Sequence, residues 1–237
     1  MAEAAQDTAP ALEISSSDGL TGWLEETGVS LAFTTGTSGK LIFIGQHDGK
    51  LSIFERSFDR ATGLYAEDDA LIMAGPYQIW RFDNALAPDQ NADGYDRLYV
   101  PQVAYVTGDV QAYDVAIAGN GEIVFSSALF SCLATVHTEF SFAPVWHPPF
   151  ISQLAPDERC LLTGFATEKG APRYVTVAAR TDTRHGWRAE AGVSGAVIDA
   201  QSGEVVADGL ALPVAPRLAG KHLWVAEGGS GYVGTVN

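Results

Sequence analysis

The chain consists mostly of short apolar runs separated by glycine, aspartate, asparagine and serine. Each run has strand length and is rich in valine, isoleucine and aromatic residues, which suit the pleated surface of a β-sheet. The pattern predicts strands over 40–45, 50–58, 70–75, 77–82, 97–108, 122–127, 173–180, 194–200, 203–209 and 222–228. Helical periodicity is nearly absent, and the one predicted helix covers residues 20–26 with Asp18 as N-cap. We therefore expect an all-β protein.

The strands repeat in units of roughly 50 residues, each with a strand, a polar turn, an apolar strand, a small-residue turn and a third strand. Units start at Thr62, Tyr113, Leu162 and Val214, so the steps are 51, 49 and 52 residues, and a shorter unit covers 30–58. A unit of this size is typical of a propeller blade, which must stack on its neighbours to bury both faces. The repeat predicts a β-propeller-like fold of about five units. An irregular β-sandwich with coincidental spacing is the alternative.

The last unit is incomplete in this interpretation, because the sequence ends at Asn237 directly after its third strand. Either the strand at 30–35 completes that unit, or the chain is a truncated piece that lacks C-terminal blades. We favour truncation, and note that an open ring leaves strand edges unpaired. Residues 1–18 are predicted to be a disordered lead, and residues 19–237 a single propeller-like domain.

Composition narrows the possible partners. Lys and Arg total 14 against 29 Asp and Glu, and the net charge is −15. Such a chain repels phosphate backbones and anionic membrane surfaces, so we expect neither nucleic acid nor membrane as a partner. The N-terminus lacks the basic and apolar regions of a signal peptide, and no apolar run has membrane-spanning length. We therefore expect a cytoplasmic protein with free, buried thiols at Cys132 and Cys160.

Several strings resemble an uncharacterised bacterial family, a propeller-like domain of unknown function that is sometimes associated with tetratricopeptide repeats. The most specific are VWHPPFISQLAPDERC (145–160), PRYVTVAARTDT (172–183) and GWR (186–188). The resemblance covers residues 20–237, and the family continues for further blades. It implies no established activity.

The resemblance also indicates where a site would lie. Members of the family carry histidine at several starts of innermost strands, and this sequence has Tyr113, Leu161 and Val214 there. All three replacements remove a potential metal ligand or acid–base group. Catalysis or metal binding by such a cluster is therefore in doubt for this chain.

A polar cluster follows the strand at 173–180 and reads as a loop on one rim of the propeller. Its candidate ligand-binding residues are Asp182, Thr183, His185, Trp187 and Arg188. Loops on a rigid scaffold often carry function, and Trp187 could stack on a ligand held by Asp182 and Arg188. The alternative is structural, with Asp182 forming an Asx-turn or pairing with an arginine to hold the loop.

A second group of candidates falls near the starts of the innermost strands, which crowd around the central channel of a propeller. Its members are Arg60, Tyr113, Asp114, Thr163 and Arg217. They could line a polar axial pocket. Asp114 could equally anchor a turn by accepting backbone hydrogen bonds.

We expect no cofactor and no metal site. Cys132 and Cys160 are not arranged as a CxxC pair, and the string from Asp89 to Gly94 lacks the acidic twelfth residue of a calcium loop, since Val100 stands there. The nucleophile elbow, the P-loop, HExxH and GxGxxG after a strand are absent.

The sequence thus favours a non-catalytic propeller that binds a small polar ligand or a protein through one rim. The alternative is an enzyme with a metal or polar site at the axis, degenerate in this member. A third possibility is a purely structural fragment that associates with other propeller chains.

Overall fold

The protein is seen here in a computed structural model that describes residues 14–67, 69–190 and 192–236. Most of the predicted lead, residues 1–13, lies outside the described residues. Residues 14–17 contain no helix or strand.

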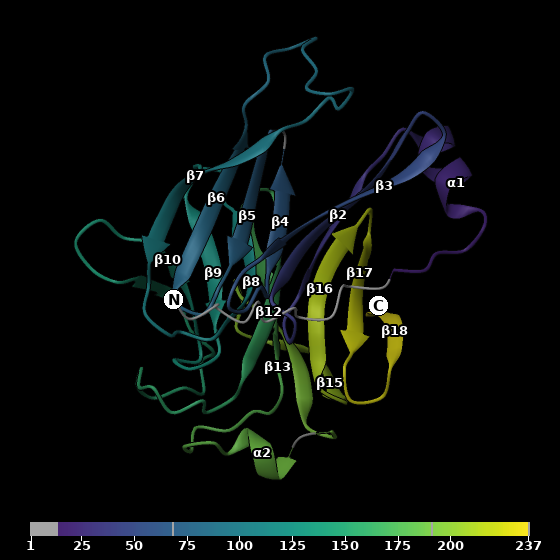
Figure 1. The fold of residues 1–237 in the computed structure, drawn as a ribbon. Coiled ribbons are helices and arrows are strands. Elements are labelled where there is room, and N and C mark those ends of the chain that lie inside the picture. The colour runs from purple at the N-terminus through teal and green to yellow at the C-terminus, as the bar shows by residue number, and fades with distance from the viewer. Residues whose placement is uncertain (1–13, 68, 191, 237) are drawn as a thin grey trace, which may run out of the picture.

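Five antiparallel sheets, each built from consecutive strands, form the blades of a propeller (Figure 1). Blade 1 contains β1 (Leu31–Thr35), β2 (Lys40–His47) and β3 (Lys50–Ser57). Blade 2 contains β4 (Leu64–Glu67), β5 (Ala70–Ala74), β6 (Gln78–Asn84) and β7 (Tyr99–Val106). Blade 3 contains β8 (Ala112–Ile117), β9 (Ile123–Ser127), β10 (Cys132–Thr135) and β11 (Ala143–Trp146). Blade 4 contains β12 (Leu162–Glu168), β13 (Ala171–Val177), β14 (Gly195–Asp199) and β15 (Val205–Leu210). Blade 5 contains β16 (Pro213–Ala219), β17 (His222–Glu227) and β18 (Tyr232–Val236).

The prediction of a β-propeller is confirmed. The inner strands of blades 2 to 5 begin at Leu64, Ala112, Leu162 and Pro213, within two residues of the repeat starts read from the sequence. In the described part of the chain, blades 2, 3 and 4 have four strands, and blades 1 and 5 have three. The strand near 30–35 does not complete blade 5, because β1 pairs with β2 in blade 1.

Each pair of consecutive blades has its own apolar core. The strands β5, β9 and β14 are buried along their whole length, and β5 is a continuous apolar run, which is typical of a buried strand. The outer strands β3, β7 and β15 are largely exposed. The four interfaces are centred on Leu41, Leu71 and Phe82 (blades 1 and 2), Ile72, Val115 and Phe125 (blades 2 and 3), Leu133, Leu162 and Val175 (blades 3 and 4), and Val197, Leu223 and Val225 (blades 4 and 5).

Hydrogen bonds from threonine side chains also join the inner strands of neighbouring blades. The hydroxyl of Thr34 donates to the carbonyl of Thr62, so blade 1 is tied to blade 2. Thr62 donates to the carbonyl of Ala112 at 2.6 Å, and Thr163 donates to that of Pro213 at 2.6 Å. We call these contacts the threonine joints. Between blades 3 and 4 the contact differs, because Asp114 accepts from the backbone N–H of Phe165.

Within the residues that the structure describes, two helices lie outside the sheets. Helix α1 (Leu20–Thr27) forms where it was predicted, because Leu24 packs against Ile42 and Ile44 of blade 1. The predicted N-cap is wrong: Gly19 occupies that position, and no side chain caps the helix. Helix α2 (Trp187–Glu190) is a single turn inside the predicted rim loop. No helix within the described ranges is long and apolar enough to cross a membrane.

Candidate functional site

An axial pocket of about 540 Å³ lies where the inner strands of blades 1, 2, 3 and 5 meet the start of blade 4. Four of the five predicted axis-lining residues border it, namely Tyr113, Asp114, Thr163 and Arg217. The pattern of the sequence did not point to the remaining wall, which includes Ala32, Phe33, Thr34, Thr62, Gly63, Leu64, Leu212 and Ala215.

An ion pair between Asp114 and Arg217 forms the charged part of the pocket. The two side chains meet in a bidentate arrangement, with both N–O distances at 2.8 Å. The Asp114 side chain is 4% exposed, and it also accepts the backbone N–H groups of Val115 and Phe165 at 3.0 Å. Burial alone would lower the pKa of Arg217, but hydrogen bonds to Asp114 and its negative charge outweigh burial and raise that pKa. The carboxylate thus connects blades 3, 4 and 5.

Three wall positions coincide with those singled out by the family resemblance. Tyr113, Leu161 and Val214 all line the axial pocket. The Tyr113 side chain is half-exposed, whereas Leu161 is buried. The pocket therefore has a phenol and two aliphatic side chains at the positions for which the resemblance implies histidine.

The turns that lead into the inner strands share an unusual backbone conformation. Gln111, Leu161 and Leu212 each stand directly before an inner strand, and their φ angles are 50°, 47° and 52°. Residues other than glycine rarely adopt this left-handed conformation, and it is strained for bulky side chains. Leu161 and Leu212 belong to the wall of the axial pocket, so the same strained turn shapes the pocket in consecutive blades.

The hydroxyl of Thr163 is occupied by structural bonds. It lies within hydrogen-bond distance of the Pro213 carbonyl, the Thr176 carbonyl and the Thr176 hydroxyl. The fifth predicted axis-lining residue, Arg60, is not among the residues that line the pocket. It lies 3.5 Å from Asp109, and both side chains are roughly half-exposed.

Asp182 anchors the rim loop to the segment before blade 4. Its carboxylate accepts from Arg159 at 2.7 Å and from the backbone N–H of Ser152 at 3.1 Å. Hydrogen bonds from Ser152 and from Arg159 lower the pKa of Asp182. This is the structural arrangement considered from the sequence, in which the aspartate pairs with an arginine. Thr183 lies beside it, with its hydroxyl 3.0 Å from that of Thr181.

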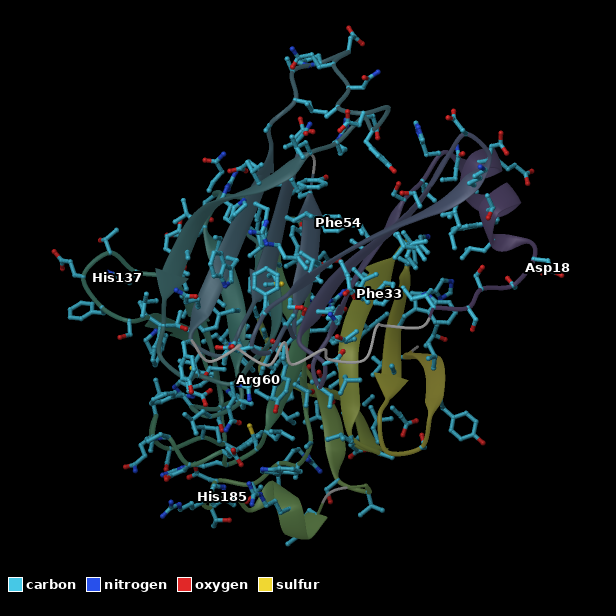
Figure 2. The ribbon with its side chains drawn as sticks, viewed as in Figure 1. Asp18, Phe33, Phe54, Arg60, His137 and His185 are labelled. Carbon is cyan, nitrogen blue, oxygen red and sulfur yellow. The ribbon has the colours of Figure 1, made fainter. Side chains whose placement is uncertain are left out.

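Glu158 binds two basic residues of the rim loop, His185 and Arg188. This contact lies near α2, where His185 is marked in Figure 2. One carboxylate oxygen lies 3.2 Å from Nδ1 of His185 and 2.9 Å from Arg188, and the other accepts from Gln111 at 2.6 Å. Burial alone would raise the pKa of Glu158, but these three hydrogen bonds together lower it. His185 and Arg188 are therefore held by one carboxylate.

Trp187 connects the rim loop to the axial pocket. Its ring packs against the apolar cluster of Ala128, Leu161, Ala178 and Leu212, two members of which line the pocket. Its buried indole N–H has no hydrogen-bond partner among the described residues. Trp187 and the axial pocket therefore share Leu161 and Leu212.

Glu158 gives the fold a specific pH dependence. Its pKa is lowered in the folded state, so its contribution to the free energy of unfolding is present above the unfolded value of about 4.3 and is lost as the pH falls below it. We expect Glu158→Gln to lower the free energy of unfolding at pH 7. The difference between this variant and the unaltered protein should become smaller as the pH falls below about 4.3. Urea unfolding at several pH values measures this. Glu204→Gln, at an exposed position directly before β15, is the control; equal pH dependence of the two variants would contradict the assignment.

Glu158 and Arg159 were not predicted as site residues. The only sign of them in the sequence is the string DER directly before a strand. Burial raises the pKa of the Cys132 and Cys160 thiols to about 12, and both cysteines are free. In the described parts of the chain, no group of three or more His, Cys, Asp and Glu side chains is placed to hold a metal ion.

Solved structures with a similar arrangement come from several proteins. Virginiamycin B lyase from Staphylococcus aureus matches with 13% identity and a TM-score of 0.49, over 87% of this chain and 62% of that chain. A streptogramin B lyase matches with 10% identity and a TM-score of 0.49, over 88% and 62%. A functionally unknown protein from Desulfotomaculum acetoxidans matches with 10% identity and a TM-score of 0.45, over 88% and 65%. The chain thus spans less than two thirds of the length of these structures.

No curated protein matches the sequence. A family match, however, covers nearly the whole chain. It extends over residues 18–237, from the turn before α1 to the last residue of the sequence. The chain therefore belongs to the family described as Domain of unknown function (DUF4915).

Proposed function

We propose that this protein is a non-catalytic binding domain that takes a small, neutral organic molecule into the axial pocket. The observation that carries the proposal is the convergence of inner strands on one hollow of about 540 Å³ with mostly apolar walls and a few polar groups. This combination is typical of small-molecule sites, in which apolar walls supply affinity and a few polar groups set orientation.

The charge of the wall favours a neutral ligand. Among the described residues that line the pocket, only Asp114 and Arg217 are charged, and they neutralise each other. An ionic ligand would have to leave water without gaining an unpaired opposite charge, which is unfavourable. A molecule with a compact apolar body and one or two hydrogen-bonding groups avoids this penalty.

Two exposed polar groups would orient such a ligand. Tyr113 is 46% exposed and carries a hydroxyl that can donate or accept. The Arg217 side chain is 50% exposed, although its guanidinium is bonded to Asp114. We assign these two side chains the polar contacts, and Leu161 and Val214 the apolar ones.

The hydrogen bonds of Asp114 support a binding role rather than a catalytic one. The carboxylate of Asp114 already accepts four hydrogen bonds, two from Arg217 and two from backbone N–H groups. A carboxylate whose oxygens are already engaged by the protein in this way has little capacity left to contact a substrate. The proposal also keeps the expected cytoplasmic location, with the two free, buried thiols as its support.

Filling the pocket tests the proposal. Val214→Trp places an indole in the pocket, and we expect it to abolish the binding of neutral fragments that the unaltered protein selects from a library in ligand-observed NMR. Tyr113→Ala, a milder change at a half-exposed residue, is expected to weaken the same fragments about fivefold, as loss of one hydrogen bond would.

The matched control is Val206→Trp, which makes the same substitution on an exposed position of β15, away from the pocket. It should bind the fragments as the unaltered protein does. Fragments that bind Val214→Trp and Tyr113→Ala with unchanged affinity would contradict an axial site. Turnover of a bound molecule by the unaltered protein would contradict the non-catalytic role.

A further inference from the structure

A second and larger hollow, of about 870 Å³, lies between blade 1 and blade 2. Among the described residues, blade 1 has three strands where blade 2 has four. In Figure 1 the long strands β2 and β3 run away from blade 2 toward α1. The outer part of blade 2 thus faces an open groove, which we call the interblade groove.

The walls of the interblade groove are largely aromatic and aliphatic. Phe43 and Phe54 line it from blade 1, and Leu71, Phe82 and Tyr99 from blade 2. The rings of Phe43 and Tyr99 stack at 6.0 Å, and those of Phe43 and Phe54 lie 6.3 Å apart. Phe54 lies on β3, where it borders the groove (Figure 2), and it is 61% exposed. The apolar residues of these walls form one contiguous patch, and a patch of this kind often marks a ligand-binding groove.

The loop before β7 covers the far end of the interblade groove. The Tyr95 hydroxyl lies 2.7 Å from that of Ser52 on β3, and the Tyr95 ring stacks on His47 at 5.1 Å. Ser52, Phe54 and Arg56 alternate along β3 and share one face of the strand. The distance from Arg56 to Ser52 is therefore about 13 Å at the usual rise of a strand. The contact between Tyr95 and Ser52 limits the occupant to roughly this length and favours a small molecule over a peptide strand.

Arg56 supplies a positive charge at the other end. It pairs across the strands with Leu41 and is exposed, and its side chain makes no ion pair or hydrogen bond within the described parts of the chain. The other charged residues of the groove lie in the covering loop: Arg97 is 3.3 Å from Asp69 and 3.7 Å from Asp96, and Asp93 is in the turn beside Tyr95. In a protein with a net charge of −15, an unpaired cation beside an apolar wall is a local site for an anion.

We propose that the interblade groove binds one anionic molecule with an apolar body, independently of the axial site. Its carboxylate, sulfonate or phosphate group contacts Arg56. Its aliphatic or aromatic body lies on Phe54 and Phe43 and points toward Tyr95. The apolar contact supplies most of the affinity, and the charge pair sets the direction in which the molecule lies.

A pair of fluorescent probes separates the two contributions. Anilinonaphthalene sulfonate has an aromatic body with an anionic group, and phenylnaphthylamine is its neutral counterpart. We expect the unaltered protein to bind the sulfonate at one saturable site in a fluorescence titration. Arg56→Gln should weaken the sulfonate about tenfold and leave the neutral probe unchanged. Phe54→Ala should weaken both probes about fivefold or more.

Matched controls use the same substitutions elsewhere. Arg180→Gln changes a half-exposed arginine outside both hollows, and Phe140→Ala changes an aromatic residue that is 66% exposed in the loop before β11. Both should bind the probes as the unaltered protein does, and near-UV circular dichroism verifies that each variant is folded. The proposal is overturned if the unaltered protein binds neither probe, or if Arg56→Gln and Phe54→Ala bind as the controls do.

The axial variant Val214→Trp keeps this proposal apart from the proposed function. It should leave the binding of both probes unchanged, because Val214 does not line the interblade groove. Loss of sulfonate binding in that variant alone would move the probe to the axial pocket and overturn the interblade site. Failure of the fragment screen, in contrast, does not affect this titration.

Discussion

Replacement of Asp114 by alanine is expected to lower the free energy of unfolding by about 3 kcal/mol. The carboxylate is almost fully buried and connects three blades through Val115, Phe165 and Arg217. Its removal leaves two backbone N–H groups without their acceptor and breaks the bidentate ion pair. Arg217 is half-exposed and can be rehydrated, so we expect the lower end of the range for buried pairs.

Urea unfolding followed by circular dichroism measures this loss, and Asp83→Ala is the matched control. Asp83 also pairs with an arginine at 2.8 Å, but Arg81 and Asp83 share one strand and both side chains are about one third exposed. An exposed pair of this kind contributes about 1 kcal/mol or less. Similar losses in the two variants would mean that Asp114 does not connect the blades.

Replacement of Gly63 by alanine is expected to lower the free energy of unfolding by about 2 kcal/mol. A Cβ atom at this position would lie 2.8 Å from the Cα of Asp114 and 3.0 Å from the carbonyl oxygen of Tyr113. Both are backbone atoms of the neighbouring inner strand, so blades 2 and 3 would have to move apart. Thermal or urea unfolding would detect the change.

Gly234→Ala is the control for this second variant. Gly234 also lies in a strand, but a Cβ atom there would meet nothing within 4 Å. Alanine in a strand restricts the unfolded chain more than glycine does, so this variant should be as stable as the unaltered protein or slightly more stable. Full stability of both variants would contradict the close approach of the inner strands of blades 2 and 3 at Gly63.

The repeat of roughly 50 residues was the feature of the sequence that predicted the propeller fold. The starts at Thr62, Tyr113, Leu162 and Val214 marked the inner strands, because each blade returns to the axis with the same order of strands and turns. Residues near those starts were therefore expected to lie close together at the axis, and Asp114 and Arg217 do form an ion pair there. Arg60 has the same place in the pattern, yet it lies 3.5 Å from Asp109 and does not line the axial pocket.

The partners of the rim loop could not be predicted from its own sequence. Asp182, His185 and Arg188 are held by Arg159 and Glu158, which lie more than 20 positions earlier in the chain. Such a pairing depends on how the connection between blades 3 and 4 folds back. The interblade groove was missed for a similar reason, because it depends on the number of strands in blade 1 and on the path of a loop from blade 2.

The threonine joints have a consequence for how propellers of this kind could change during evolution. Thr62 and Thr163 each bond the carbonyl of a residue 50 positions later, so donor and acceptor are separated by one repeat. A duplicated gene segment of that length would encode its own threonine donor. It would also encode the carbonyl that accepts the hydrogen bond from the preceding blade. Blade number could then increase or decrease by whole repeats without a new contact having to arise. Blade 3, where Asp114 takes over the connection, could not be exchanged so freely.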